Sequence, residues 1–310
     1  MRVAAVFPGQ GSHRAGCLDP WIGDDAFEIA DRISSRIGRD VVALARSPET
    51  GGRTADAQPV IFATSMVALT ALARADVSFD VVAGHSLGEY SAAVAAGSVN
   101  MEDAAALVDE RGRAMGQACA QNPGTLAAVV KLEPDQVDAI VREAPGVVIA
   151  NDNAVGQVVV AGTPAAIDEL RGRVRDAGGR VLPLDVEGAF HSPAMEPAVA
   201  SVATAVGALA FDDPSTPLIT GTTAEVLTRG HQVASALVDG MLAPVRWRLV
   251  QDRMIDIGVT DVIEVGPGGV LVGMAKRSMP GVRRHRVENP EDVATVAAVL
   301  AAAHATGEVS

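Results

Sequence analysis

Gly84-His85-Ser86-Leu87-Gly88 follows directly on the apolar run Val81-Val82-Ala83. A Gly-x-Ser-x-Gly between a buried strand and a helix is typical of a nucleophile elbow, because its glycines permit a tight, strained turn that exposes the serine oxygen at the sheet edge. The alanine-rich segment from Glu89 to Ala96 ends at Gly97 and predicts a helix that starts at the serine. The free N–H groups and positive dipole end of that helix would face any oxyanion formed at Ser86.

The composition favours a sheet covered by helices. Of the 310 residues, 48% are hydrophobic but only 3% are aromatic, so the core must be built from Ala, Val, Leu and Ile. The net charge of −13 argues against a nucleic acid partner. Cys17 and Cys119 lie far apart without metal-ligand spacing, so we expect no metal and a reduced, cytoplasmic protein with two free thiols. The apolar run before Pro8 is too short for a signal peptide, and no run approaches membrane-spanning length, so no membrane partner is expected.

Strand and helix patterns alternate along the first part of the chain and again after Pro193. The expected strands here are residues 3–7, 81–83, 217–220 and 262–265, and the expected helices are residues 24–37, 59–74, 87–96 and 101–118. This β-then-α alternation predicts a large α/β hydrolase-like domain with a parallel sheet.

The middle of the chain has a different pattern. Strand-like residues 125–131, 147–150, 157–161 and 180–184 alternate with helical residues 133–143 and 163–177. The order βαββαβ within about sixty residues is typical of a ferredoxin-like domain. We therefore expect residues 123–188 to form a small inserted domain, and residues 1–122 and 189–310 to form the two parts of the large one. Sites often form in the crevice between two such domains.

A serine nucleophile needs a base, and histidine is the usual one. The sequence offers six: His13, His85, His191, His231, His285 and His304. His85 is adjacent to the serine and is expected to pack in the elbow. His191 lies in a turn of small residues where the inserted domain rejoins the large one, so we predict that it faces the crevice and acts as the base. Asp185 and Glu187 are near it in sequence, but nothing selects either to orient the imidazole, and a backbone carbonyl would serve equally well.

Arg111 lies on an apolar stripe of the expected 101–118 helix, with Ala104, Val108 and Met115. Arg113 is expected to point to the opposite, solvent side with Asp109. An unpaired buried charge costs several kcal/mol, so Arg111 needs a partner. The alternatives are a structural ion pair and a substrate carboxylate held by two hydrogen bonds.

The loop Gly9-Gln10-Gly11-Ser12 follows the first strand, where a parallel sheet presents loops to ligands. The backbone N–H of Gln10 could be a second oxyanion donor, and a purely structural turn is equally compatible with the residues.

These motifs occur in a recognisable order together with Arg111-Gly112, Asn151-Asp152-Asn153, Ala189-Phe190-His191-Ser192 and Glu264-Val265-Gly266-Pro267-Gly268. Together they resemble malonyl-CoA:acyl carrier protein transacylases, including the acyltransferase domains of polyketide synthases. The resemblance spans the chain as far as Lys276-Arg277.

The resemblance implies a role for each matching residue. Ser86 would attack the malonyl-CoA thioester with His191 as general base, and the oxyanion would lie between the N–H groups of Leu87 and Gln10. Arg111 would bind the free malonyl carboxylate. The phosphopantetheine thiol of a holo acyl carrier protein would then take the malonyl group from Ser86, so ping-pong kinetics are expected without a bound cofactor. Phe190 would favour malonyl over methylmalonyl through its bulk.

The chain departs from the family pattern at two positions. His13 stands where members usually have a second Gln, and Gly240 stands where they tend to have a Gln near the segment that supplies a hydrogen-bond acceptor to the histidine. If the acceptor is a main-chain carbonyl, Gly240 can still provide it, whereas if a side chain is needed, His191 would be less well held.

Because carrier proteins and this chain are both acidic, binding requires a local basic patch. The candidates are Arg171, Arg173, Arg175, Arg180, Lys276, Arg277, Arg283, Arg284 and Arg286. An ordinary solvated face is the other interpretation.

The motifs favour a malonyl transferase for fatty acid or polyketide biosynthesis. A proofreading hydrolase of acyl thioesters could use the same serine and histidine, and a trans-acting polyketide acyltransferase could carry another extender unit. Arg111 distinguishes the malonyl transferase from the hydrolase, because a hydrolase of neutral acyl chains gains nothing from a buried cation.

Overall fold

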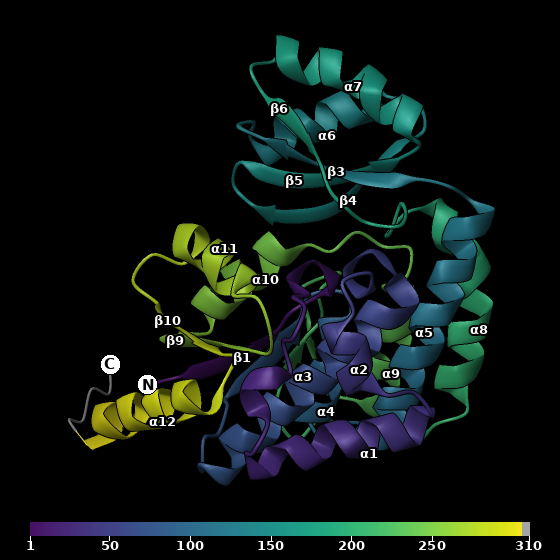
Figure 1. Cartoon of the computed structure of the whole chain (residues 1–310). Coiled ribbons are helices and arrows are strands. Elements are labelled where there is room, and N and C mark those ends of the chain that lie inside the picture. The colour runs from purple at the N-terminus through teal and green to yellow at the C-terminus, as the bar shows by residue number, and fades with distance from the viewer. Residues whose placement is uncertain (306–310) are drawn as a thin grey trace.

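Two β-sheets organise the chain, and the computed structural model describes residues 1–305 (Figure 1). The larger sheet has the strand order β10-β9-β1-β2-β7-β8. Its strands are β1 (Val3–Phe7), β2 (Val81–Gly84), β7 (Leu218–Ile219), β8 (Val226–Leu227), β9 (Asp261–Val265) and β10 (Arg283–Val287). All neighbouring strands are parallel except β7 and β8, so the prediction of a parallel sheet is confirmed apart from this edge. The loop between β7 and β8 is too short for a crossover, and it therefore forms an antiparallel hairpin.

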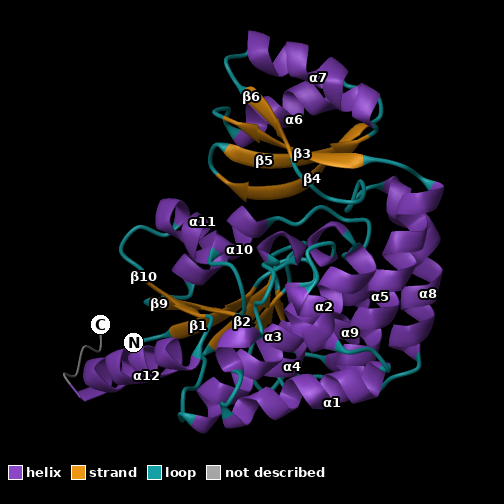
Figure 2. Ribbon diagram, in the orientation of Figure 1, coloured by secondary structure: helices purple, strands orange, loops and turns teal. Residues whose placement is uncertain are grey.

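Helices cover both faces of the large sheet (Figure 2). In β1, Val3, Ala5 and Phe7 face one apolar core, whereas Ala4 and Val6 face a second core. The helices of this domain are α1 (Glu28–Ile37), α2 (Val41–Arg46), α3 (Thr54–Arg74), α4 (Gly88–Ala95), α5 (Met101–Gln121), α8 (Glu196–Gly207), α9 (Gly230–Asp239), α10 (Trp247–Asp256), α11 (Val270–Ser278) and α12 (Pro290–Ala305). Helices α10 and α11 pack in the second core, and the other helices lie on the side of the first. Burial on both faces explains why the strands are continuously apolar.

Helix α3 begins five residues earlier than the sequence suggested and contains Pro59 in its interior. A proline there leaves the carbonyl of the residue four positions earlier without its helical donor. That carbonyl belongs to Ala55, and it accepts a 2.7 Å hydrogen bond from Arg39 instead. Among the described helices, α3 alone is long and apolar enough to cross a membrane, but 78% of its apolar window is buried inside the molecule. It is a core helix.

The expected 24–37 helix also differs at its start. Residues Asp25–Phe27 form a 3-10 turn, and α1 begins only at Glu28. The Asp24 side chain accepts the Ala26 N–H, which caps the 3-10 turn and delays the α-helix.

The smaller sheet is antiparallel, with the order β4-β5-β3-β6. It consists of β3 (Thr125–Val130), β4 (Val147–Ala154), β5 (Gln157–Gly162) and β6 (Arg180–Pro183), and α6 (Pro134–Arg142) and α7 (Pro164–Asp176) cover one of its faces. The chain order βαββαβ is the predicted one, and this unit lies above the large sheet in Figure 1. We propose the boundaries 1–122, 123–188 and 189–310 for the domains, because α5 ends at Gln121 and β6 ends at Pro183.

Candidate active site

The turn between β2 and α4 is strained in the way that a nucleophile elbow requires. Ser86 has a φ of 54°, in the left-handed region that a side chain rarely occupies. A Cβ on Gly84 would lie 2.0 Å from the Gly88 carbonyl carbon, and a Cβ on Gly88 would lie 2.0 Å from the Phe7 oxygen. Both positions therefore admit only glycine, and the packing against β1 fixes the direction of the serine side chain.

His191 lies against this serine, with its Nε2 2.8 Å from the Ser86 Oγ. Its Nδ1 lies 3.0 Å from the carbonyl oxygen of Ala243. Since a carbonyl only accepts, Nδ1 must carry the proton and Nε2 must accept the hydroxyl proton of Ser86. The predicted serine–histidine pair is thus assembled in the orientation of nucleophile and base, and a main-chain carbonyl orients the imidazole.

The surroundings of His191 keep it neutral. Burial lowers its pKa to about 3, and the positive charge of Arg111 acts in the same direction. The hydrogen bond to Ala243 opposes these effects but is weaker. A neutral imidazole can accept a proton, so His191 is poised as a base at physiological pH.

Arg111 on α5 is 3% exposed and points at the serine. Its Nη2 donates to the Ser86 Oγ at 3.0 Å, its Nη1 donates to the Gln58 Oε1 at 2.7 Å, and its guanidinium lies 5.5 Å from the centre of the Tyr90 ring. Its Nε is buried without a partner. Within residues 1–305, no carboxylate lies within 4.0 Å of this guanidinium. The structural ion pair is therefore absent there as a direct contact, although the buried Glu89 acts electrostatically on Arg111 from a greater distance.

Arg113 is exposed as predicted, but Asp109 is not. Asp109 is 5% exposed because Arg39 and Arg113 both bind its carboxylate, at 2.9 and 3.0 Å. The expectation that Asp109 faces solvent was wrong, since ion pairing permits its burial.

The Gln10 loop packs directly against the elbow. A Cβ on Gly9 would lie 2.8 Å from the His85 oxygen, so glycine permits the close approach. Among the loop and turn hydrogen bonds of the described residues, neither Gln10 nor Leu87 donates its N–H. The Gln10 side chain donates to Thr54 Oγ1 at 3.1 Å. Two backbone donors thus remain available near Ser86.

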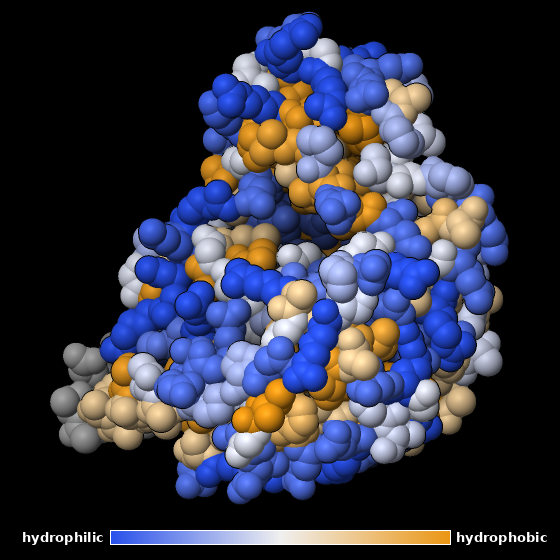
Figure 3. All heavy atoms as spheres, viewed as in Figure 1, coloured by the Kyte–Doolittle hydropathy of each residue, from blue (hydrophilic) through white to orange (hydrophobic). Residues whose placement is uncertain are grey.

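A cavity of about 250 Å³ opens over Ser86 between the two domains. Figure 3 shows the surface hollowed below the small domain. Besides Gln10, Ser86 and His191, apolar residues of both domains line it: Leu126, Ala128, Val159, Leu184, Val186, Phe190, Val270, Leu271 and Met274. The crevice therefore suits a small acyl group on an extended arm.

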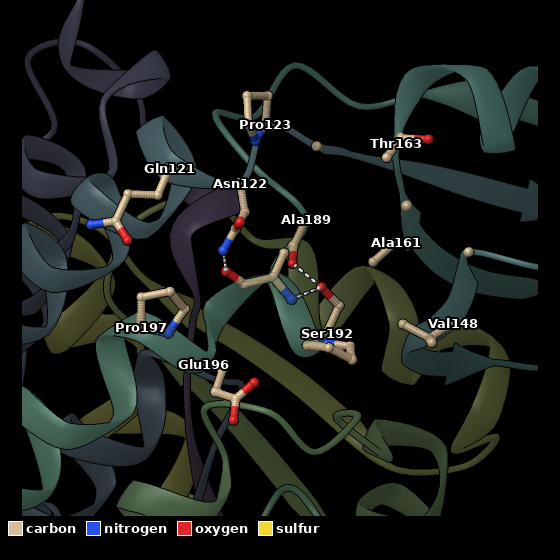
Figure 4. Close-up of a pocket in the computed structure, with 15 residues that line it drawn as sticks. Gln121, Asn122, Pro123, Val148, Ala161, Thr163, Ala189, Ser192, Glu196 and Pro197 are labelled. Atoms are coloured by element: carbon tan, nitrogen blue, oxygen red, sulfur yellow. Dashed lines mark hydrogen bonds between the residues drawn. The ribbon is translucent and has the colours of Figure 1, made fainter.

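A second cavity of about 780 Å³ lies where the chain crosses between the domains (Figure 4). There Asn122 donates to the Ala194 oxygen at 3.1 Å, and the Ser192 hydroxyl donates to the Ala189 oxygen at 2.6 Å. Its lining lacks Ser86 and His191, so its greater size does not make it the reaction site.

Three of the other histidines, His85, His285 and His13, have structural surroundings, and His231 is exposed at the start of α9. His85 packs on Trp247 and lies 2.9 Å from Asn153 Oδ1, as expected of an elbow residue. His285 binds Asp261, and His13 is half-buried beside Gly51. The side chain of His304 lies outside the described part. Glu187 accepts the Thr54 N–H and is therefore not the group that orients His191. Within residues 1–305, no three His, Cys, Asp or Glu side chains are grouped to hold a metal.

Sequence reasoning missed Gln58, Tyr90 and the Ala243 carbonyl. Gln58 had a signal, since it is a polar residue within the apolar stretch of α3 and is fully buried. Gly240 lies near His191 as expected, in an ordinary helical conformation, but Ala243 supplies the closer acceptor. The absence of a Gln side chain at position 240 therefore does not leave His191 unsupported.

Comparison with known proteins agrees with this geometry. A family model described as "Acyl transferase domain" matches residues 5–303. A malonyl CoA-acyl carrier protein transacylase of Mycobacterium bovis is 36% identical over 300 residues, which cover 94% of this chain and 98% of that protein. An acyl-carrier-protein S-malonyltransferase structure from Burkholderia pseudomallei has a TM-score of 0.92 and 34% identity, covering 96% of this chain and 100% of that one. A malonyl-transacylase solved in complex with its type II PKS acyl-carrier protein (holo) also has a TM-score of 0.92, with 29% identity and coverage of 96% and 100%.

Proposed function

The chain belongs to the acyl transferase family, and on that premise we propose that it moves a malonyl group from malonyl-CoA to the phosphopantetheine thiol of an acyl carrier protein. The observation that carries the proposal is the position of Arg111. A buried cation without a carboxylate partner in the described chain lies 3.0 Å from the nucleophilic oxygen.

In the first half-reaction, the Ser86 Oγ attacks the thioester carbon while its proton passes to His191 Nε2. The negative oxygen that forms would accept hydrogen bonds from the N–H groups of Leu87 and Gln10. The tetrahedral intermediate then collapses, the C–S bond breaks, and the CoA thiolate leaves with the proton that His191 returns. The product is a malonyl ester of Ser86.

Arg111 accounts for the acyl group selected. The carboxylate carbon of a malonyl ester is three bonds from the Ser86 Oγ, within reach of a guanidinium that already contacts that oxygen. A carboxylate there would satisfy the buried Nε or the Nη groups of Arg111 with charge-assisted hydrogen bonds. Phe190 lines the cavity over Ser86, and its bulk would exclude an α-methyl substituent and so favour malonyl over methylmalonyl.

In the second half-reaction, His191 takes the proton of the carrier thiol, and the thiolate attacks the malonyl ester. Serine leaves as the alkoxide and recovers its proton from His191. Because both donors use one site in turn, the kinetics are ping-pong. The chain's residues perform this chemistry without a cofactor of their own, since the phosphopantetheine is attached to the carrier.

We place carrier docking at Lys276 and Arg277 at the end of α11. These residues border a shallow depression that shares Gln157, Val270 and Met274 with the site cavity. Helix α7, which carries the alternative arginines, lies at the far end of the small domain (Figure 1). Its Arg171, Arg173 and Arg175 are paired with nearby acids. Opposite charge beside the entrance would guide an acidic carrier to the serine. The two free thiols, Cys17 and Cys119, are consistent with a cytoplasmic reaction.

Acylation is tested by intact mass spectrometry of the protein after exposure to malonyl-CoA, methylmalonyl-CoA and acetyl-CoA in turn. We expect a stoichiometric malonyl adduct, little methylmalonyl adduct, and no adduct on Ser86→Ala. An adduct that persists in Ser86→Ala would place the nucleophile elsewhere. Preferential acetylation would instead favour the hydrolase alternative, and a strong methylmalonyl adduct would favour the transferase with another extender unit.

A further inference from the structure

Asp152 and Arg248 form an ion pair between the two domains. Asp152 lies on β4 of the small sheet, and Arg248 lies in the first turn of α10. The Arg248 Nη2 is 2.8 Å from Asp152 Oδ2, and its Nε is 3.2 and 3.1 Å from Oδ1 and Oδ2. The side chains are only 28% and 17% exposed. A partly buried guanidinium that binds both carboxylate oxygens is a directional contact, unlike an exposed ion pair.

Backbone hydrogen bonds join the same two segments. The Val245 N–H donates to the Ala150 oxygen at 2.9 Å, and the Asp152 N–H donates to the Val245 oxygen at 2.8 Å. Val245 thus extends the edge of the small sheet beside β4. It lies only two residues after Ala243, whose carbonyl accepts the Nδ1–H of His191. The small sheet therefore holds the loop that orients the catalytic base.

We propose that Arg248 is a positioning residue for acyl transfer: by binding Asp152 it fixes Val245 against β4 and keeps the Ala243 carbonyl on His191. The proposal rests on the proposed function only in taking His191 as the base. Arg248 touches neither Ser86 nor Arg111, so its loss should disturb the imidazole while leaving the carboxylate site intact. Through the Asp152–Arg248 ion pair, the orientation of the His191 imidazole would also depend on the position of the small domain relative to the large one.

The variant Arg248→Met tests this, because methionine keeps much of the apolar stem and removes every hydrogen bond to Asp152. We expect kcat for malonyl transfer to fall about tenfold, with KM for malonyl-CoA within about twofold, since misplacing a catalytic group by about 1 Å lowers the rate strongly. Asp152→Asn should reduce kcat in the same direction, and the double variant should be no slower than Arg248→Met alone. Arg248→Lys should recover part of the rate.

Asp252 provides a matched control. It lies 3.8 Å from Arg248 on the same helix, is 51% exposed, and within residues 1–305 forms no hydrogen bond or ion pair with the small sheet. Asp252→Asn changes the charge around Arg248 but leaves the contact between the domains, so its kcat should equal that of the parent. A fall equal to that of Asp152→Asn would overturn the proposal.

NMR of ¹⁵N-labelled histidine reports the tautomer of His191, which a purely structural role of Arg248 would leave unchanged. In the parent protein, NMR should show His191 in the Nδ1–H form, and Arg248→Met should show a mixture of tautomers at a temperature where the fold is intact. An unchanged tautomer together with an unchanged kcat, even with a lower Tm, would mean that the pair only stabilises the fold.

The rate of serine sulfonylation by phenylmethylsulfonyl fluoride separates this proposal from the proposed function, because the reagent needs the base but no malonyl group. A slower rate in Arg248→Met supports the positioning role even if malonyl transfer fails in the parent. A rate equal to that of the parent contradicts the role even if malonyl transfer is established.

Discussion

Ser86 and His191 are 105 residues apart in sequence, yet the Oγ of one lies 2.8 Å from the Nε2 of the other, and both have left-handed backbones, with φ of 54° and 55°. For residues with a Cβ, such a conformation costs on the order of 1–3 kcal/mol and persists only where the surroundings impose it. At Ser86 the close contact of Gly84 with Gly88, and of Gly88 with Phe7 on β1, imposes it. At His191 the turn that follows the small domain does so, and the strain aims both side chains at one point.

Arg111→Ala is expected to abolish malonyl selectivity. Removing the buried guanidinium should lower kcat/KM for malonyl-CoA by an amount equivalent to roughly 2–5 kcal/mol of activation free energy. Because acetyl-CoA has no free carboxylate, its kcat/KM should fall less. The ratio of kcat/KM for the two donors measures this directly. Arg113→Ala is the control, because Arg113 is on the same helix but half-exposed and directed away from the site. An equal loss with both donors would contradict the role of Arg111 in binding the carboxylate.

The pH dependence of serine reactivity should reflect the low pKa of His191. Because the folded-state pKa is about 3, the imidazole stays neutral down to that pH, and the rate should be flat between about pH 5 and 8. The positive charge of Arg111 is one cause of the lowered pKa, so Arg111→Ala should raise it toward the ordinary value of 6.5. The acid limb of the variant should then begin at a higher pH than that of the parent, while burial, the largest cause, still holds the pKa below 6.5. Sulfonylation rates across this range measure it, and an acid limb near pH 6.5 in the parent would be inconsistent with a buried neutral base.

Gly88→Ala should destabilise the protein severely. The new Cβ would lie 2.0 Å from the Phe7 oxygen and 2.7 Å from its carbon, so the backbone of β1 or α4 must shift. We expect a loss of about 3 kcal/mol in the free energy of unfolding together with lost serine reactivity. Gly273→Ala is the control, since nothing lies within 4 Å of its Cβ position and alanine is the better helix former. Equal stability of the two variants in urea unfolding would show that the elbow is not held by this packing.

Charge reversal at Lys276 and Arg277 should weaken binding of the carrier protein without affecting acylation of Ser86. We expect Lys276→Glu/Arg277→Glu to raise KM for the holo carrier protein about tenfold or more at low salt, while the burst of malonyl-Ser86 formation stays at the parent rate. The same reversal at Arg171 and Arg175 on α7 should change neither quantity. If the α7 variant loses carrier affinity instead, docking occurs on the small domain.

Much of this architecture is predictable from sequence because local signals agree with the fold. The βαββαβ order, the elbow and the apolar stripe that carries Arg111 all follow from hydrophobic period and glycine placement. The start of α3 was not predicted, because Pro59 normally limits a helix and only the tertiary contact from Arg39 compensates its missing donor. The antiparallel strand β8 was also missed, because two residues carry too little periodicity.

The candidate site likewise has features that could be predicted from the sequence and features that could not. The proposed roles of Ser86 and His191 could be predicted from their residue types and motifs, whereas the support around them depends on backbone groups and long-range contacts. The Ala243 carbonyl has no sequence signature, since every residue carries one. Asp152 and Arg248 are 96 positions apart, and nothing local relates them.

The central claim is most directly tested by following the malonyl group itself. Purified protein loaded with malonyl-CoA and freed of excess donor is mixed with holo acyl carrier protein, and both intact masses are recorded over time. The proposed mechanism predicts that the malonyl mass leaves the enzyme and appears on the carrier at the same rate, far faster than it is lost in buffer. Loss to water at an equal rate with and without carrier would contradict a transferase and identify a hydrolase.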